Sequence, residues 1–429
     1  MELQSKKIHI TDTIAGLFKT GFFHIIGAGS LNKILMVLLS IVLVRTLSKA
    51  DYGAYAYAYN IVSFFVLFNG FGVTSAALQI CSELYESQQR SDTFFGYAYK
   101  SGIVVDCFIA VAIIISALAI PLAIQGSNEL LVLYCFYPLL MLLCDIKLVY
   151  LRTNFLNREY AFATNLQTIL LVVFSIIGAC LFAAPGLIIG QSLAYLLCYL
   201  YLCIKFPFRF SSSIKLTKAK KIDFWGIAGI SAFNNGIGHA LTLVGTFFVG
   251  LLLTNDELVA NYQVATYIPF GLLFIPSAVM TYCYPYFARN RNDRKWTLVS
   301  FAKVIVACLV CMVILTVMVI IFADYIVYFL FGELYLDIVP TLRILMVGFC
   351  ITASFRLPVG NLLVTQRKLF FNSLVGVFSI AVCVISSLYL IPSYGLIGAA
   401  IAYDITMLFG AVLNVPYYVL TILKIPEKK

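Results

Sequence analysis

Long apolar stretches alternate with short polar, mostly basic ones along almost the whole chain. A helix that spans the hydrocarbon core of a bilayer needs about 20 predominantly apolar residues, and twelve stretches approach or exceed that length. Two neighbouring pairs are separated only by turn signals, Ala184-Pro185-Gly186 and Ile391-Pro392-Ser393. The predicted spans are residues 22–47, 54–80, 101–121, 130–151, 161–184, 186–204, 224–252, 258–287, 298–323, 341–364, 370–392 and 394–423.

Composition supports a bilayer as the solvent of this chain. The sequence is 62% hydrophobic and only 11% charged, whereas soluble domains are about half apolar and about 25% charged. We therefore expect an all-α polytopic membrane protein. The 12 cysteines fall in or beside apolar stretches, so no disulfide framework is indicated. No zinc-protease, nucleotide-binding or nucleophile-elbow motif is present, and we expect neither an enzyme nor a metal or cofactor site.

The basic residues predict the orientation of the spans. Cytoplasmic loops of membrane proteins carry an excess of Lys and Arg. With twelve spans and both termini on one side, 22 of the 29 lysines and arginines lie on that side and one, Lys49, lies on the other. We therefore place both termini in the cytoplasm. The net charge of +10 then reflects topology and contact with anionic lipid headgroups, and no nucleic-acid partner is expected.

Weak internal similarity predicts two halves of six spans. Gly53-Ala54-Tyr55 opens the second span and Ala260-Asn261-Tyr262 opens the eighth, 207 residues later. Equal topology in the two halves indicates a parallel repeat. We expect an N-terminal lobe at 1–206, a basic cytoplasmic linker at 207–223 and a C-terminal lobe at 224–429. Few identities carry this alignment, and chance similarity is the alternative.

Six cations lie within the predicted spans. They are Lys33, Arg45, Lys147, Lys303, Arg343 and Arg356. A charge at bilayer depth costs about 2.5–3.5 kcal/mol on insertion scales, so such residues usually face a cavity or a partner. Lys147 and Lys303 lie near span ends, from which long side chains reach the interface. Lys33 and Arg356 lie near mid-bilayer, with Arg45 and Arg343 nearer the outer surface, and these four are our candidate anion-binding residues. The alternative is a structural charge paired with an acid or a backbone carbonyl.

The seventh span carries a polar stripe. The polar side chains recur at steps of four, four, three and four residues, which places them on one helical face. They are Ser231, Asn235, His239, Thr242 and Thr246. Under the 207-residue offset, His239 corresponds to Asn32 beside Lys33, so both faces are candidates for lining one cavity. Helix–helix packing is the alternative, because small polar residues also join membrane helices.

Embedded acids are fewer than embedded cations. Asp106, Asp145 and Asp404 lie within the spans. Asp404, Asp145 and His239 are candidates for proton or sodium coupling. Because the deep charges are mainly basic, a cavity lined by them favours an anion, and Arg and Lys suit phosphate oxygens in particular.

The first 80 residues resemble a known transporter family. The stretches that carry the resemblance are GSLNKIL at 29–35, LVRTLSKADYGAYAYA at 43–58 and SAAL at 75–78, followed by LNR at 156–158. They are similar to Wzx-type lipid-linked oligosaccharide flippases, in the polysaccharide transporter branch of the MOP (multidrug/oligosaccharidyl-lipid/polysaccharide) exporter superfamily. The motifs are loose, whereas twelve spans in two halves fit the family along the whole chain.

This resemblance implies a multi-pass protein of the bacterial inner membrane. Its substrate would be an undecaprenyl-diphosphate-linked oligosaccharide, the repeat unit of an O-antigen or capsule, flipped from the cytoplasmic to the outer leaflet by alternating access. Lys33, Arg45 and Arg356 would neutralise the diphosphate in a central cavity. Membrane lipids and other polysaccharide-assembly proteins would be its partners, in lipopolysaccharide or polysaccharide biosynthesis.

Two other readings stay open at this point. A multidrug or other lipid exporter of the same superfamily would share the fold, although a cationic drug would favour an embedded acid over Lys33. A membrane-embedded glycan polymerase or glycosyltransferase would need an extramembrane loop with catalytic residues, and the predicted outer loops are short. The sugar structure and the coupling ion do not follow from the sequence.

Overall fold

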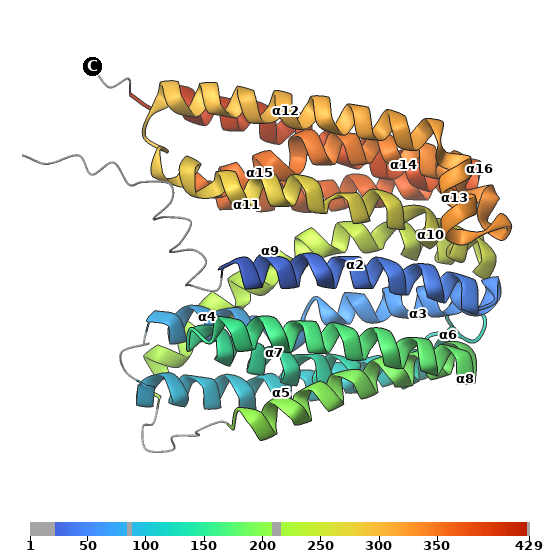
Figure 1. Ribbon diagram of the computed structural model, residues 1–429, viewed down its shortest axis with the longest axis horizontal. Coiled ribbons are helices and arrows are strands. Elements are labelled where there is room, and N and C mark those ends of the chain that lie inside the picture. Colours follow the sequence, from blue (N-terminus) through green and yellow to red (C-terminus); the bar gives the residue numbers. More distant parts are fainter. Residues whose placement is uncertain (1–21, 84–87, 208–215, 427–429) are drawn as a thin grey trace, which may run out of the picture. The chain divides into compact units, whose positions relative to one another are not determined.

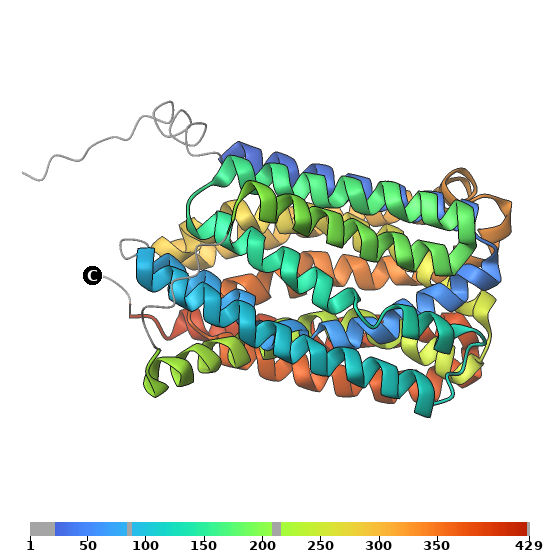
Figure 2. The same cartoon turned by 90° about the horizontal axis from the view of Figure 1, so that it is seen from below.

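A computed structural model describes residues 22–83, 88–207 and 216–426. The regular structure of these residues is helical, without strands (Figures 1 and 2), which confirms the predicted all-α class. The helices are α2 (Phe22–Thr46), α3 (Lys49–Val66), η1 (Asn69–Gly72), α4 (Val73–Glu83), α5 (Gln88–Ala119), α6 (Ser127–Leu133), α7 (Tyr137–Thr153), α8 (Asn157–Lys205), α9 (Lys218–Leu253), α10 (Asp256–Leu272), α11 (Phe274–Arg289), α12 (Arg294–Ile321), α13 (Ala323–Phe331), η2 (Glu333–Ile338), α14 (Val339–Ile351), η3 (Thr352–Arg356), α15 (Leu357–Thr365) and α16 (Leu369–Leu423).

Each predicted span is largely helical, but the span at 54–80 is interrupted between α3 and α4 and the span at 130–151 between α6 and α7. Within the described ranges, nine helical stretches are long and apolar enough to cross a membrane. Two of the nine, α8 and α16, are each interrupted by non-helical residues and correspond to two predicted spans. The helix α2 matches the first predicted span. The protein is therefore a multi-pass membrane protein.

Helix α8 is a pair of helices joined by a very tight turn. Phe182 and Ala183 have non-helical backbone angles, and Ala183 has a φ of 49°. The break lies just before Pro185, which continues inside the second helix because proline is tolerated in a first helical turn. A Cβ on Gly178 would lie 2.0 Å from the carbonyl oxygen of Gly186. The two halves therefore pack backbone to backbone.

Helix α16 repeats this construction. Its break lies at Gly395, with a φ of 57°, three residues after Pro392. A Cβ on Gly398 would lie 2.0 Å from the carbonyl oxygen of Leu390. Both turns were predicted at the proline itself. The observed breaks lie two or three residues away from Pro185 and Pro392, because each proline stays within a helix.

The chain divides into two compact units, described separately below. Unit 1 comprises residues 1–42, 68–115 and 132–232, and unit 2 comprises residues 43–67, 116–131 and 233–429. The predicted lobes at 1–206 and 224–429 stay a prediction. Residues 1–21, and residues 208–215 of the predicted 207–223 linker, lie outside the described residues.

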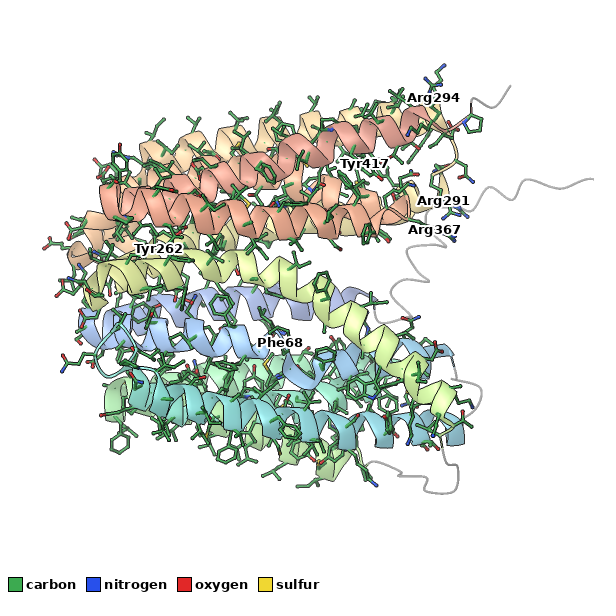
Figure 3. All side chains as sticks on the ribbon, turned by 180° about the vertical axis from the view of Figure 1, so that it is seen from behind. Phe68, Tyr262, Arg291, Arg294, Arg367 and Tyr417 are labelled. Carbon is green, nitrogen blue, oxygen red and sulfur yellow. The ribbon has the colours of Figure 1, made fainter. Side chains whose placement is uncertain are left out.

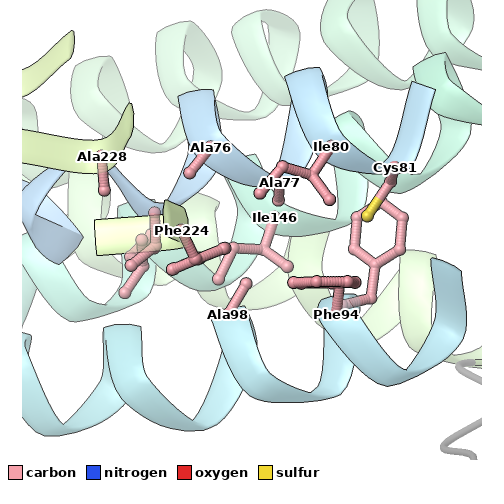
Figure 4. Close-up of a cluster of buried hydrophobic side chains, with 12 residues drawn as sticks. Ala76, Ala77, Ile80, Cys81, Phe94, Ala98, Ile146, Phe224 and Ala228 are labelled. Atoms are coloured by element: carbon pink, nitrogen blue, oxygen red, sulfur yellow. The ribbon is translucent and has the colours of Figure 1, made fainter. Parts of the chain in front are cut away.

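Unit 1 is held together by small and aromatic side chains. Figure 4 shows Ala76, Ala77 and Ile80 of α4 facing Phe94 and other residues of neighbouring helices. The cluster has these buried members: Val73, Ala76, Ala77, Ile80, Cys81, Phe94, Phe95, Ala98, Leu142, Ile146, Phe224 and Ala228. It joins α4, α5, α7 and the start of α9, and thus fixes α4 against α7.

Unit 2 includes a close crossing between α3 and α10. A Cβ on Gly53 would lie 1.9 Å from the backbone oxygen of Asp256, so only glycine allows the helices to approach this closely. Beside this crossing, the hydroxyls of Tyr52 and Tyr267 share a hydrogen bond. The two segments used to predict an internal repeat therefore pack against each other.

Basic loops of unit 2 lie at one end of its helices. Figure 3 shows Arg291, Arg294 and Arg367 together at that end, with Tyr262 toward the opposite end. The amide of Gln366 donates a hydrogen bond of 3.4 Å to the carbonyl of Arg291, which joins the α11–α12 and α15–α16 connections. The basic residues assigned to the cytoplasmic side thus converge in space, as the orientation rule requires.

Candidate functional site

Arg356 ends a π-helical turn in the middle of a long helix. The turn η3 joins α14 to α15, and Pro358 follows it at the start of α15. Proline cannot donate the normal helical hydrogen bond, and π turns accommodate such interruptions and often mark functional positions. The structure thus shows a change of helical register just before Pro358.

The Arg356 guanidinium lies against α16. Its Nη1 donates to the Met407 sulfur at 3.0 Å, and a Cβ on Gly410 would lie 3.2 Å from its Nε. A thioether is a weak acceptor. No carboxylate of the described residues forms an ion pair with Arg356. A half-buried guanidinium thus lacks an anionic partner.

Other polar groups of unit 2 have unused hydrogen-bonding capacity. Tyr403 lies within electrostatic reach of both Arg356 and Asp404. The Oδ1 of Asp404 and the Oγ of Ser354 are buried without a hydrogen-bond partner among the described residues. Asp404 does not pair with Arg356, because it lies beside Gly348, about two turns before Arg356 along the α14–α15 helix. The Asp404 carboxylate and the Arg356 guanidinium therefore do not neutralise each other.

Lys33 of unit 1 is exposed on α2 and has no ion pair with a described residue. The neighbouring Asn32 has a buried Oδ1 without a hydrogen-bond partner in the described part of the chain. Within a membrane span, an exposed ammonium needs water or an anion beside it. These properties suit the anion-binding role predicted for Lys33, which stays a prediction.

Arg45 and Arg343 are engaged at helix ends of unit 2. The Arg45 Nε donates to the Leu330 carbonyl at 2.9 Å, and its Nη2 donates to the Phe329 carbonyl. These carbonyls belong to the last turn of α13, where a cation also complements the helix dipole. Arg343 forms an ion pair of 2.7 Å with Asp324. These contacts fit the alternative in which an embedded cation is a structural charge paired with an acid or a backbone carbonyl.

The polar stripe of α9 is divided between exposed and packed residues. His239 and Thr242 are exposed, whereas Thr246 is buried and donates to the Gln263 side chain of α10 at 3.0 Å. Thr246 thus joins two helices, as the packing alternative expects. Ser231 is half-buried, and the Asn235 side chain lies outside the described residues.

Sequence reasoning missed the roles of two charged groups in unit 1. The Oδ1 of Asp106 accepts a 2.7 Å hydrogen bond from the Gly70 backbone in η1, where Gly70 has a φ of 53°. Lys147 is buried and donates to the Phe206 carbonyl at the end of α8, at 2.8 Å. Both contacts stabilise helix ends. Asp145, by contrast, lines a pocket together with Arg152.

Three solved structures show the fold. An inward-facing MATE-family multidrug transporter of the MOP superfamily has a TM-score of 0.74 at 13% identity, covering 92% of this chain and 95% of that chain. The lipid II flippase MurJ, in an inward closed conformation, has a TM-score of 0.74 at 15% identity, covering 93% and 88%. A MOP superfamily transporter from Pyrococcus furiosus has a TM-score of 0.63 at 12% identity, covering 96% of each chain.

No curated protein matches the sequence. A family described as "Polysaccharide biosynthesis protein" matches residues 42–340, well over half of the chain. The resemblance seen in the sequence is therefore confirmed at the level of the superfamily fold and of polysaccharide biosynthesis. The chain belongs to this family of polysaccharide biosynthesis proteins and has the helical membrane fold of MOP superfamily transporters.

Proposed function

We propose that the protein is a flippase of the bacterial inner membrane. Its substrate is an undecaprenyl-diphosphate-linked oligosaccharide, the repeat unit of an O-antigen or capsule, which it moves from the cytoplasmic to the outer leaflet by alternating access. The family supports a role in polysaccharide assembly. The fold supports transport without covalent chemistry and occurs also in a flippase of lipid II.

The observation that carries the proposal is the environment of Arg356. Its nearest polar contact is the Met407 sulfur, so its charge is not neutralised by a described carboxylate. A guanidinium binds phosphate oxygens through a planar pair of donors. In unit 1, Lys33 forms no ion pair with a described residue either and is a second candidate ligand for a phosphate group. A substrate with negative charge suits each of these cations, whereas a cationic drug does not.

The membrane potential favours the proposed direction. With a negative cell interior, each negative charge that moves outward gains about 2.3 kcal/mol per 100 mV. Asp404, His239 and Asp145 are the residues we propose for proton or sodium coupling, should the potential alone not drive transport. Of these, Asp404 has a buried carboxylate oxygen without a hydrogen-bond partner among the described residues.

Reconstitution in liposomes tests the proposal. The vesicles carry an undecaprenyl-diphosphate oligosaccharide in one leaflet, and a lectin or glycosidase measures its arrival in the other. We expect Arg356→Gln and Lys33→Ala to reduce the initial rate at least tenfold, a loss equivalent to about 1.4 kcal/mol. Arg356→Lys keeps the positive charge but lacks the planar pair of donors of the guanidinium. It should therefore retain more activity than Arg356→Gln.

Lys303→Ala is the matched control. Lys303 is an exposed cation on α12 outside the proposed site, so this variant should flip the substrate at the rate of the unmodified protein. Unchanged rates after removal of both Arg356 and Lys33 would overturn the anion-binding site. No crossing by the unmodified protein under a potential and under proton and sodium gradients would overturn the flippase.

A further inference from the structure

A pocket in unit 1 with both polar and apolar lining lies between α4 and α7, with the start of α8 on one side. Its volume is about 230 Å³. Thr74, Ser75 and Leu78 line it from α4, Asp145, Leu148, Val149 and Arg152 line it from α7, and Tyr160 lines it from α8. The pocket lies wholly within one unit, and its walls carry a carboxylate, a guanidinium and three hydroxyl groups.

The spacing along α7 arranges the charges. Asp145 and Arg152 are seven residues apart, so they lie on nearly the same helical face and about 10 Å apart along the axis. Arg152 is exposed and Asp145 is half-buried. No ion pair joins the two among the described residues. The pocket lining thus includes a half-buried carboxylate and an exposed guanidinium.

The hydroxyls of Thr74 and Ser75 are available because of the helix break before α4. Elsewhere in unit 1, Ser101 and Thr153 donate to the carbonyl four residues earlier, at 2.7 and 3.1 Å. The corresponding carbonyls for Thr74 and Ser75 belong to Gly70 and Phe71, whose positive φ values take them out of helical geometry. The first turn of α4 therefore presents donors and acceptors to the pocket.

We propose that this pocket binds one neutral sugar residue, a hexose or N-acetylhexosamine, of the lipid-linked substrate. The Asp145 carboxylate accepts from adjacent sugar hydroxyls, the Ser75 and Thr74 hydroxyls bond the opposite edge of the ring, and the exposed Arg152 guanidinium also donates. Leu148 and its apolar neighbours contact the C–H face. This assignment rests on the proposed function, because it gives a binding site to the sugar part of the proposed lipid-linked substrate.

Size and charge favour a sugar over other ligands. The pocket volume of about 230 Å³ lies below the roughly 300–1,000 Å³ of pockets for drug-sized ligands, which suits a small ligand such as a single sugar ring. A phosphate would meet the Asp145 carboxylate. No group of three metal-binding side chains occurs in the described ranges, so a metal ion is not favoured. The first turn of α8 carries Arg158, on the side predicted to be cytoplasmic, where the substrate starts.

Saturation-transfer NMR on the purified full-length protein in detergent tests the pocket directly. The probes are methyl glycosides of glucose, galactose, N-acetylglucosamine and N-acetylgalactosamine, with glycerophosphoethanolamine as a phospholipid-headgroup probe. We expect transfer to at least one glycoside, reduced at least fivefold by Asp145→Asn and by Ser75→Ala. The matched controls are Asp293→Asn, which keeps a good N-cap for α12, and Ser101→Ala, which lies outside the pocket.

The outcomes separate this proposal from the flippase itself. Transfer to no glycoside, equal transfer in Asp145→Asn, or Asp145-dependent transfer only to glycerophosphoethanolamine would overturn the sugar site. Variant melting temperatures within 2 °C of the unmodified protein, as an order-of-magnitude criterion, exclude misfolding as the cause of lost binding. Glycoside binding that depends on Asp145, without lipid flipping by the unmodified protein, would support the sugar site and refute the flippase.

Discussion

The crossing of α3 and α10 in unit 2 makes a sharp prediction for Gly53→Ala. The added Cβ would lie 1.9 Å from the Asp256 carbonyl oxygen, 2.5 Å from its carbonyl carbon and 3.0 Å from its Cα. All three atoms belong to the backbone, so no side-chain rotation relieves the overlap. Ordinary contact begins at 3.4 Å, and reaching it requires the two helices to separate by about 1.5 Å at this point.

The expected cost follows from that separation. Overpacking of a well-packed core typically costs about 1–3 kcal/mol, and the Tyr52–Tyr267 hydrogen bond beside the crossing weakens as well. One kcal/mol corresponds to about 2–4 °C in the melting temperature of a domain of this size. We therefore expect Gly53→Ala to melt about 2–12 °C below the unmodified protein. A thiol-reactive dye that reports on the buried cysteines during heating, such as Cys308 and Cys383, measures this shift.

Gly238→Ala provides the matched control for Gly53→Ala. Gly238 lies within the helix α9, and a Cβ there would meet nothing within 4 Å. Alanine favours a helix over glycine by about 0.5–1 kcal/mol, so this variant should be at least as stable as the unmodified protein. Equal melting temperatures for Gly53→Ala and the unmodified protein would refute the close crossing described above.

Two further predictions concern charges that stabilise helix ends. Arg45→Gln removes charged hydrogen bonds to the Phe329 and Leu330 carbonyls, each bond contributing about 1.5–3 kcal/mol, and should lower the melting temperature by several degrees; lost transport at unchanged stability would instead favour the anion-binding role predicted from the sequence. Asp106→Asn keeps an acceptor for the Gly70 N–H and should melt close to the unmodified protein, whereas Asp106→Leu leaves that donor unsatisfied, costing about 1–3 kcal/mol. Equal melting temperatures for the two Asp106 variants would contradict this account.

The membrane helices could be predicted because one physical quantity sets their length. A span must cover the hydrocarbon core, so the apolar stretches identify it without knowledge of tertiary contacts. Local breaks were harder to place, as Pro185 and Pro392 show. Proline removes the hydrogen bond to the carbonyl four residues earlier but is tolerated in the first turn of a helix. The sequence therefore does not show on which side of the proline the chain turns.

The candidate site was harder to predict from the sequence, because the depth of a residue in the membrane does not show which residues contact it. Arg45 was placed near the outer surface, but its carbonyl acceptors lie 284 and 285 residues later in the chain. The pocket around Asp145 was missed, although Asp145 was singled out, because Ser75 and Thr74 face it only after the chain breaks at Gly70. Arg356 was singled out because an arginine near mid-bilayer is rare in a membrane span, and its role in binding stays a prediction.

The interrupted helix α8 also bears on how the chain enters the membrane during synthesis. Between Glu159 and Lys205, α8 contains no charged residue, and its turn exposes Leu181 and Phe182 rather than polar groups. No hydrophilic loop has to cross the hydrocarbon layer to form the hairpin. The two halves of α8 can therefore leave the translocon together as a prefolded pair, already in contact through Gly178 and Gly186.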